Sequence, residues 1–243
     1  MNTQKIALIT GANKGIGLET ARQLAQQKIT VLIGARDLKK GEAAAAQLRA
    51  DQLEARAIEL DVSRPESIHR AAEKIDGEFG RLDILVNNAG VMLDEQEMKM
   101  SEQSLDIWRT TFETNLFGLV ETTRAFLPLL RKSEAGRIVN LSSILGSITL
   151  HATPGSPVYD SKLPVYDVSK TAVNAYTVHL AYELKDSKIK VNAAHPGWVK
   201  TDLGGEGATM EIVDGAKTSV ALATIGEDGP NGAYMHRGET LPW

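Results

Sequence analysis

The stretch Thr10-Gly11-Ala12-Asn13-Lys14-Gly15-Ile16-Gly17 decides the fold of this chain. It follows a short apolar run at residues 5–10 and leads at once into a helical pattern. Glycine permits a tight turn and a close approach of the backbone, while a helix N-terminus offers unpaired N–H groups to a phosphate. Such a turn is sometimes only a tight connection, but its place after the first strand favours nucleotide binding.

Strand and helix patterns alternate from this turn onward. The predicted strands are residues 5–10, 30–35, 55–60, 82–87, 137–142 and 190–194. The predicted helices are residues 16–27, 38–50, 65–79, 101–132 and 164–187, followed by a helix near 214–223 and a seventh strand near 232–235. These strands are mostly continuous in hydrophobicity instead of alternating, which is typical of a parallel sheet covered on both faces. We therefore predict an α/β fold, a Rossmann-like doubly wound parallel sheet of about seven strands in the order 3-2-1-4-5-6-7, with helices on both faces.

Composition narrows the class of protein. The chain has 243 residues, of which 42% are hydrophobic and 24% are charged, and we expect one domain spanning residues 1–243. The net charge is -4 and the Lys and Arg residues are scattered, which argues against nucleic acid or an anionic membrane as a partner. The chain has no cysteine and its five histidines show no paired ligand spacing, so no metal site is predicted.

The first residues and the apolar runs indicate the cellular compartment in which the protein is expected. The run at residues 6–9 is too short for the core of a signal peptide, and no later stretch approaches the length that crosses a bilayer. We therefore expect a cytoplasmic protein.

Tyr166 and Lys170 lie four residues apart in a predicted helix, so their side chains are neighbours. A cation beside a phenol favours the phenolate and lowers the pKa of the phenol, which makes the pair a candidate general acid and base. The same spacing also occurs by chance, with a partly buried ring beside a solvated charge. The near copy at Tyr159 and Lys162 is rejected, because its lysine follows after three residues in a segment bracketed by prolines.

Two cations predict which dinucleotide binds. Cofactors without a 2′-phosphate usually meet an acidic residue at the end of the second strand, whereas this strand ends in Gly34-Ala35-Arg36. Arg36 and Lys14 suit a 2′-phosphate, which arginine can bind in a bidentate manner. The alternative is that both are ordinary surface cations.

Several motifs in one order resemble the short-chain dehydrogenase/reductase family in its compact, single-domain form. They are the glycine turn, Leu60-Asp61-Val62, Asn87-Asn88-Ala89-Gly90, and Pro196-Gly197-Trp198-Val199-Lys200-Thr201-Asp202. The chain is most similar to the NADPH-dependent carbonyl reductase branch. The resemblance implies NADP(H) as the cofactor. It implies cofactor contacts from Gly11, Asn13, Lys14, Gly15, Ile16, Gly17, Arg36, Asp61, Val62, Asn88, Ala89, Gly90, Tyr166, Lys170, Pro196, Gly197, Val199 and Thr201.

The resemblance also implies a catalytic set. Ser143 would hydrogen-bond the substrate oxygen, with Ser142 as the alternative, and Tyr166 would exchange the proton. Lys170 would lower the pKa of Tyr166 and bind the nicotinamide ribose. Asn115 would hold a water that links Lys170 to solvent.

The substrate side is less defined by the sequence. Thr201 is expected beside the nicotinamide, and Trp198 forms either a wall of the substrate pocket or part of a core or lid. The glycine-rich loop at residues 197–210 is expected to cover the site, since open α/β sheets bind ligands at the carboxyl ends of their strands. A plain surface connection is the alternative. The segment at residues 147–164 resembles an insertion found in carbonyl reductases. It can cover the face where relatives assemble through the helices bearing Asn115 and Tyr166, which leaves monomer, dimer and tetramer open.

The predicted function is NADPH-dependent reduction of a ketone or aldehyde, with a small-molecule carbonyl or alcohol as the partner. An alcohol dehydrogenase working in the oxidative direction is the alternative within the same class. A protein that senses NADP(H) without turnover is the alternative from another class, since fold alone does not define function.

Overall fold

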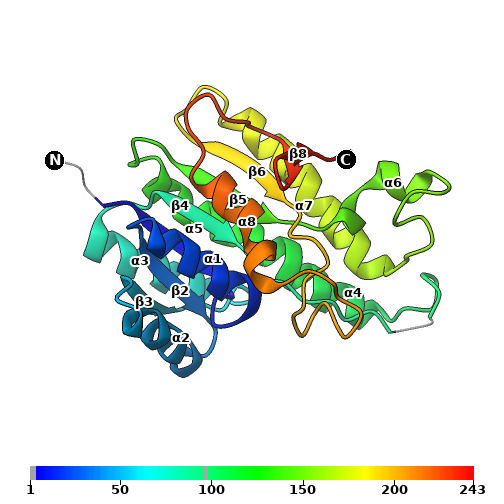
Figure 1. Cartoon of the computed structure of the whole chain (residues 1–243), viewed down its shortest axis with the longest axis horizontal. Coiled ribbons are helices and arrows are strands. Elements are labelled where there is room, and N and C mark those ends of the chain that lie inside the picture. The colour runs from blue at the N-terminus through cyan, green and yellow to red at the C-terminus, as the bar shows by residue number, and fades with distance from the viewer. Residues whose placement is uncertain (1–3, 96–97) are drawn as a thin grey trace.

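A computed structural model describes residues 4–95 and 98–243, and an eight-stranded sheet runs through its centre (Figure 1). The strand order is β3-β2-β1-β4-β5-β6-β7-β8. The strands are β1 (Ile6–Thr10), β2 (Thr30–Ala35), β3 (Ala55–Glu59), β4 (Ile84–Asn87), β5 (Arg137–Leu141), β6 (Lys190–Ala194), β7 (Tyr234–His236) and β8 (Glu239–Thr240). Neighbouring strands from β3 to β7 are parallel, and β8 pairs with β7 in the antiparallel direction. The predicted order of the first seven strands is confirmed.

The helices cover both faces of the sheet. They are α1 (Gly15–Gln26), α2 (Leu38–Ala50), α3 (Pro65–Phe79), α4 (Leu105–Phe112), α5 (Gly118–Leu130), α6 (Ile148–Ala152), α7 (Pro164–Glu183) and α8 (Ile212–Ala223), with a π-helical turn η1 (Glu113–Phe117) and a 3₁₀ turn η2 (Ile144–Gly146). One core cluster joins the sheet to α1, α2 and α8. A second joins it to α3, α5 and α7. The two clusters explain why the central strands β1, β2 and β4 are mostly apolar along their whole length, as both of their faces are buried.

The structure corrects three local predictions. The single helix predicted at residues 101–132 is wrong: α4 begins after Ser104, whose hydroxyl accepts from the N–H of Ile107, and the π-helical turn separates α4 from α5. Residues 147–164 contain the short helix α6, which the irregular sequence did not predict. The strand β8 was also missed, because its two residues are exposed and carry no apolar pattern.

The carboxyl ends of the parallel strands meet at one edge of the sheet. The glycine turn follows β1, the segment at residues 88–95 follows β4, Ser142 and Ser143 follow β5, and the loop at residues 197–210 lies beyond β6. This edge is where open α/β sheets bind their ligands.

Candidate active site

The glycine turn is held in a conformation that needs glycine. Gly11 and Gly15 have φ values of 62° and 58°, in the left-handed region that other residues rarely adopt. A Cβ atom at Gly17 would lie 2.5 Å from Asn88 Nδ2, so the helix begins in close contact with the segment after β4. Lys14, the N-cap residue of α1, provides no side-chain cap, which leaves the first N–H groups of this helix available to an anion.

The segment after β4 is bound to the glycine turn. The Asn88 side-chain amide donates to Thr10 O at 2.8 Å and to Gly11 O at 3.2 Å. The Thr10 hydroxyl accepts from the N–H groups of Asn88 and Ala89, both at 3.0 Å. Two of the predicted cofactor-binding motifs therefore form one rigid unit.

Asp61 and Val62 follow β3 at the same edge. The Asp61 carboxylate accepts from the N–H and the hydroxyl of Ser63 at 3.0 and 2.7 Å, so this half-buried side chain is fixed. A Cβ atom at Gly118 would lie 2.4 Å from Val62 O, which brings this segment against the start of α5.

The two predicted phosphate-binding cations have different surroundings. Arg36 is exposed directly after β2 and forms no ion pair with a residue that the structure describes. Lys14 pairs instead with Asp202 of the loop at residues 197–210, and both side chains are largely exposed. The sequence did not predict this ion pair, which ties the glycine turn to the loop.

Tyr166 and Lys170 lie in the first two turns of α7, and both are buried. The Lys170 ammonium lies 5.6 Å from the centre of the Tyr166 ring and donates to Leu141 O at 2.8 Å. The N-terminus of α7 is capped by a residue that lies far from it in the sequence. The Asp94 carboxylate accepts from the N–H groups of Val165 and Tyr166 at 2.8 and 3.0 Å.

Asn115 sits in the π-helical turn between α4 and α5 and is buried. Its amide nitrogen donates to Val91 O at 2.8 Å and to the Ser169 hydroxyl at 2.9 Å, and its oxygen accepts from Val91 N at 2.8 Å. A Cβ atom at Gly90 would lie 3.4 Å from Asn115 Oδ1 and 3.5 Å from Lys170 Nζ, so both side chains approach this glycine. Both amide hydrogens are used, so a water could bind this side chain only at the remaining lone pair of Oδ1.

The two serines after β5 have different environments. The Ser142 hydroxyl donates to Asn174 Oδ1 at 2.6 Å in the interior. The Ser143 hydroxyl accepts from Leu145 N at 3.3 Å, which leaves its hydrogen free, and the Ser143 side chain lies beside Tyr166 and lowers its pKa. This arrangement favours Ser143 over Ser142 for contact with a substrate.

Burial dominates the electrostatics of the pair on α7. It raises the pKa of Tyr166 to about 12, and the carboxylates of Asp167 and Asp94 add to this effect. Burial also lowers the pKa of Lys170 to about 8. The pKa of Tyr166 therefore moves in the opposite direction to the predicted lowering by Lys170, because desolvation of the phenolate outweighs the nearby cation.

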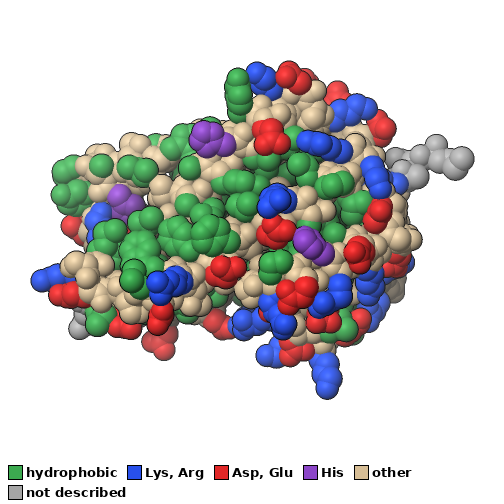
Figure 2. Space-filling view, turned by 180° about the vertical axis from the view of Figure 1, so that it is seen from behind, with side chains coloured by type: hydrophobic (Ala, Val, Ile, Leu, Met, Phe, Trp, Pro, Cys, Tyr) green, Lys and Arg blue, Asp and Glu red, His purple; other side chains and the backbone are tan. Residues whose placement is uncertain are grey.

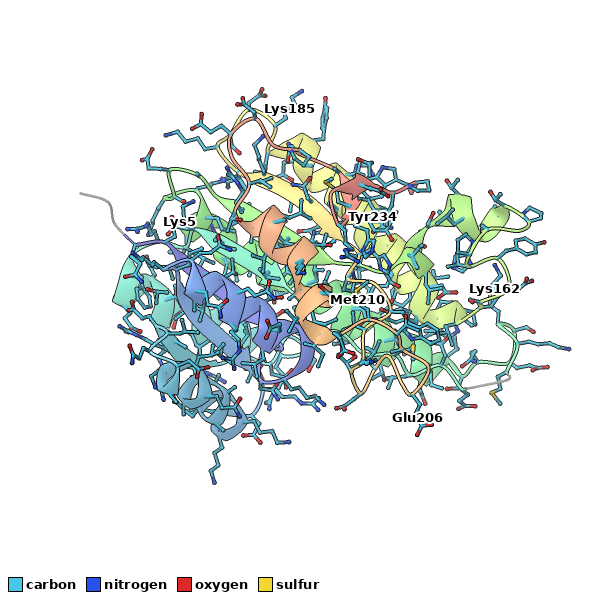
Figure 3. The ribbon with its side chains drawn as sticks, viewed as in Figure 1. Lys5, Lys162, Lys185, Glu206, Met210 and Tyr234 are labelled. Atoms are coloured by element: carbon cyan, nitrogen blue, oxygen red, sulfur yellow. The ribbon has the colours of Figure 1, made fainter. Side chains whose placement is uncertain are left out.

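The loop at residues 197–210 begins at Gly197, whose φ of 98° requires glycine. Val199 is buried and forms a β-bridge with Met210, which Figure 3 places on the segment leading into α8. Thr201 lies beside Gly15, so the loop reaches the glycine turn. Trp198 is 58% exposed and donates from its indole nitrogen to Gly204 O at 2.8 Å, which excludes the core role left open by the sequence.

Besides Asp94, sequence reasoning missed two further residues at this edge, Tyr234 and His195. Tyr234 of β7 is fully buried, its hydroxyl donates to Ser143 O, and its ring stacks on Trp243 with 5.4 Å between centres. His195, directly before Pro196, accepts at Nδ1 from Ile144 N. The one feature of the local sequence that could have indicated a role for His195 is its place directly before Pro196 and Gly197. Tyr234 lies in β7, which the sequence predicted only approximately, near residues 232–235.

Hydrophobic side chains are visible on the face opposite to that of Figure 1 (Figure 2). Exposed large hydrophobic residues of α4, η1 and α7 include Leu105, Phe117 and Val168. These elements include those that carry Asn115 and Tyr166, and the predicted assembly through them stays a prediction. In the described part of the chain, no helix combines the length and apolarity needed to cross a bilayer.

Fold and site together define a dinucleotide-binding α/β protein with a serine, a tyrosine and a lysine at the carboxyl edge of its sheet. The model of the short chain dehydrogenase family matches residues 5–211, and the chain belongs to this family. The predicted family resemblance is thereby confirmed.

Individual relatives place the chain within the family. It is 39% identical over 231 residues to the short-chain dehydrogenase anuI of Penicillium roqueforti, covering 92% of this chain and 90% of the relative. It is 32% identical over 280 residues to carbonyl reductase [NADPH] 1 of Mus musculus, covering 100% and 99%. The crystal structure of NADPH-bound carbonyl reductase from chicken fatty liver has a TM-score of 0.86 at 26% identity, covering 99% of each chain. The resemblance to the carbonyl reductase branch is confirmed.

Proposed function

We propose that this protein reduces a ketone or aldehyde to an alcohol with NADPH, and that Tyr166 is the proton donor. Its membership of the carbonyl reductase branch makes it an NADP-dependent oxidoreductase that acts on small molecules. The observation that carries the finer proposal is the position of the Ser143 side chain beside Tyr166, with the buried Lys170 ammonium one helical turn away.

The residues at the site fit the cofactor. Gly11 and Gly15 leave a backbone cradle at the start of α1, where phosphate oxygens can accept from N–H groups. Lys170 has three donor hydrogens, and within the described residues it uses one of them, on Leu141 O. The remaining donors suit the hydroxyl groups of a ribose. The bound cofactor supplies hydride to the carbonyl carbon.

Two side chains of this protein would bind and protonate the carbonyl oxygen of the substrate. Ser143 donates its free hydroxyl hydrogen to the carbonyl oxygen and orients it. Tyr166 gives its phenolic proton to the same oxygen as negative charge develops there. The phenolate then recovers a proton from solvent, and the charge of Lys170 stabilises the phenolate in the meantime.

The ionisation state of Tyr166 fits its proposed role as the proton donor. Because burial raises its pKa to about 12, the phenol stays protonated at neutral pH and is ready to donate.

Turnover of NADPH with a panel of ketones and aldehydes tests the proposal. Tyr166→Phe should lower kcat at least a hundredfold while NADPH binding, followed by its fluorescence, stays within about twofold. Tyr159→Phe is the matched control and should leave kcat unchanged. Tyr159 is exposed, and the lysine beside its ring is Lys162. Equal activity of the wild type and Tyr166→Phe would contradict the assignment, and binding of NADPH without any turnover would favour a sensing protein.

The same assay with NADH tests the two cations. Arg36→Ala and Lys14→Ala should each weaken NADPH more than NADH, since only NADPH carries the 2′-phosphate. A clear preference of the wild type for NADH would contradict both assignments.

A further inference from the structure

His195 lies directly after β6, with its ring between the carboxyl ends of two strands. Its Nδ1 accepts from Ile144 N at 3.1 Å and from Gly197 N at 3.4 Å. Ile144 follows Ser143, so the imidazole is one residue away from the hydroxyl proposed to bind the carbonyl oxygen. The ring therefore joins the serine side of the site to the loop on the nicotinamide side.

These contacts fix the tautomer of His195. A nitrogen that accepts from backbone N–H groups carries no hydrogen, so the hydrogen of the neutral ring is on Nε2. Burial and the neighbouring His236 ring, 4.7 Å away between centres, lower the pKa of His195 to about 3. The imidazole is consequently neutral at working pH, with Nε2–H as a constant donor.

The Nε2–H group lacks a protein acceptor. His195 as a whole is only 7% exposed, yet no residue in 4–95 or 98–243 accepts from its Nε2. Nε2 is also not among the described buried side-chain atoms that lack a partner, so this atom keeps some exposure to solvent. A nearly buried donor of this kind favours any ligand that supplies an acceptor, because leaving it unpaired is costly.

We propose that His195 is a specificity-determining residue whose Nε2–H binds a second acceptor oxygen next to the reacting carbonyl of the substrate. This inference rests on the proposed carbonyl reduction. It predicts a preference for substrates such as α-keto esters over simple ketones of the same size, since the latter leave Nε2–H unpaired.

A matched pair of substrates tests the role of His195. Ethyl pyruvate and butyl methyl ketone have chains of equal length, and only the first has an acceptor beside the reacting carbonyl. His195→Asn retains an acceptor near Nδ1 and removes the donor at Nε2. We expect the ratio of kcat/KM for ethyl pyruvate to that for butyl methyl ketone to fall about five- to tenfold, the value of one neutral hydrogen bond.

Further variants distinguish a change in substrate preference from a general effect on the structure of the protein. His195→Gln places an amide donor near Nε2 and should recover part of the ratio. His179→Asn, on the exposed side of α7, should leave the ratio unchanged. The melting temperature and NADPH affinity of His195→Asn should stay close to those of the wild type.

The outcomes distinguish this inference from the proposed function. An equal loss of kcat/KM for both substrates, or no loss for either, would overturn the role of His195 while carbonyl reduction stands. A wild-type protein that reduces butyl methyl ketone but not ethyl pyruvate would also overturn the role of His195, while carbonyl reduction stands. A wild type that reduces no carbonyl compound would overturn both.

Discussion

The carboxylate of Asp94 caps the helix that carries Tyr166. Its two oxygens accept from the N–H groups of Val165 and Tyr166 at 2.8 and 3.0 Å, whereas Leu163, the residue before the helix, provides no side-chain cap. A carboxylate at this end also interacts favourably with the helix dipole. The segment after β4 thereby holds Tyr166, the proposed proton donor, in position from outside its own helix.

Loss of this cap should affect both stability and catalysis. Asp94→Ala leaves two N–H groups of α7 without their acceptor, and should lower the free energy of unfolding by about 1 kcal/mol. We expect kcat to fall about tenfold, since a small shift of Tyr166 disturbs proton transfer. Asp94→Asn retains one acceptor and should lie between Ala and the wild type in chemical denaturation and in NADPH turnover.

The neighbouring Glu95→Gln serves as a control, because the Glu95 side chain makes no such contact with α7 in the described residues. Full kcat in Asp94→Ala would show that α7 keeps Tyr166 in place without the cap.

Replacement of the two serines after β5 should change different properties of the protein: activity for Ser143 and stability for Ser142. Ser143→Ala removes the hydroxyl beside Tyr166 and should lower kcat/KM about a hundredfold, with little change in melting temperature. Ser142→Ala leaves Asn174 Oδ1 without its donor in the interior, and should lower the free energy of unfolding by about 1 to 3 kcal/mol. Carbonyl reduction and thermal unfolding of both variants measure the contrast, and a reversed pattern would assign the catalytic hydroxyl to Ser142.

The parts of the fold predicted from sequence are those defined by local patterns. Continuous apolar runs such as residues 30–35 predict buried parallel strands, and the glycine turn needs its residue types at a fixed spacing. Tyr166 and Lys170 share a helix, so their proximity is also a local property. These predictions depend on neighbours in the chain, which the sequence displays directly.

The unpredicted features depend on contacts between distant segments. Asp94 reaches α7 from the segment after β4, and Tyr234 reaches Ser143 from the far end of the chain. The raised pKa of Tyr166 depends on how deeply the ring is buried, which residue spacing does not reveal. Local patterns therefore predicted Ser143, Tyr166 and Lys170, which the structure brings together, but not the residues that position them.

Asp167 should make stability depend on pH. Burial raises the pKa of its carboxyl from 3.8 to about 7, and its Oδ1 has no partner in the described structure. The folded state therefore holds this proton more tightly than the unfolded state, so this contribution to stability is lost as pH rises from about 4 through 7. Asp167→Asn removes the charge, and should be more stable than the wild type at pH 8 by about 2 kcal/mol, with a smaller difference at pH 5.

Melting temperatures of Asp167→Asn and the wild type across this range provide the measurement. The exposed Asp160→Asn, in the same region of sequence, is the control and should follow the wild-type profile. Parallel profiles for Asp167→Asn and the wild type would show that the Asp167 carboxyl has an ordinary pKa in the folded protein.

Two glycine substitutions should change stability in opposite directions. A Cβ atom at Gly17 would lie 2.5 Å from Asn88 Nδ2 and 2.9 Å from Gly11 O, so Gly17→Ala must displace the segment that binds the glycine turn. We expect a loss of about 2 kcal/mol in the free energy of unfolding. Gly77 lies inside α3 with no atom within 4 Å of its would-be Cβ, so Gly77→Ala should add about 0.5 to 1 kcal/mol through helix propensity alone. Chemical denaturation of the two variants provides the comparison, and a stable Gly17→Ala protein would show that Asn88 can move aside without loss.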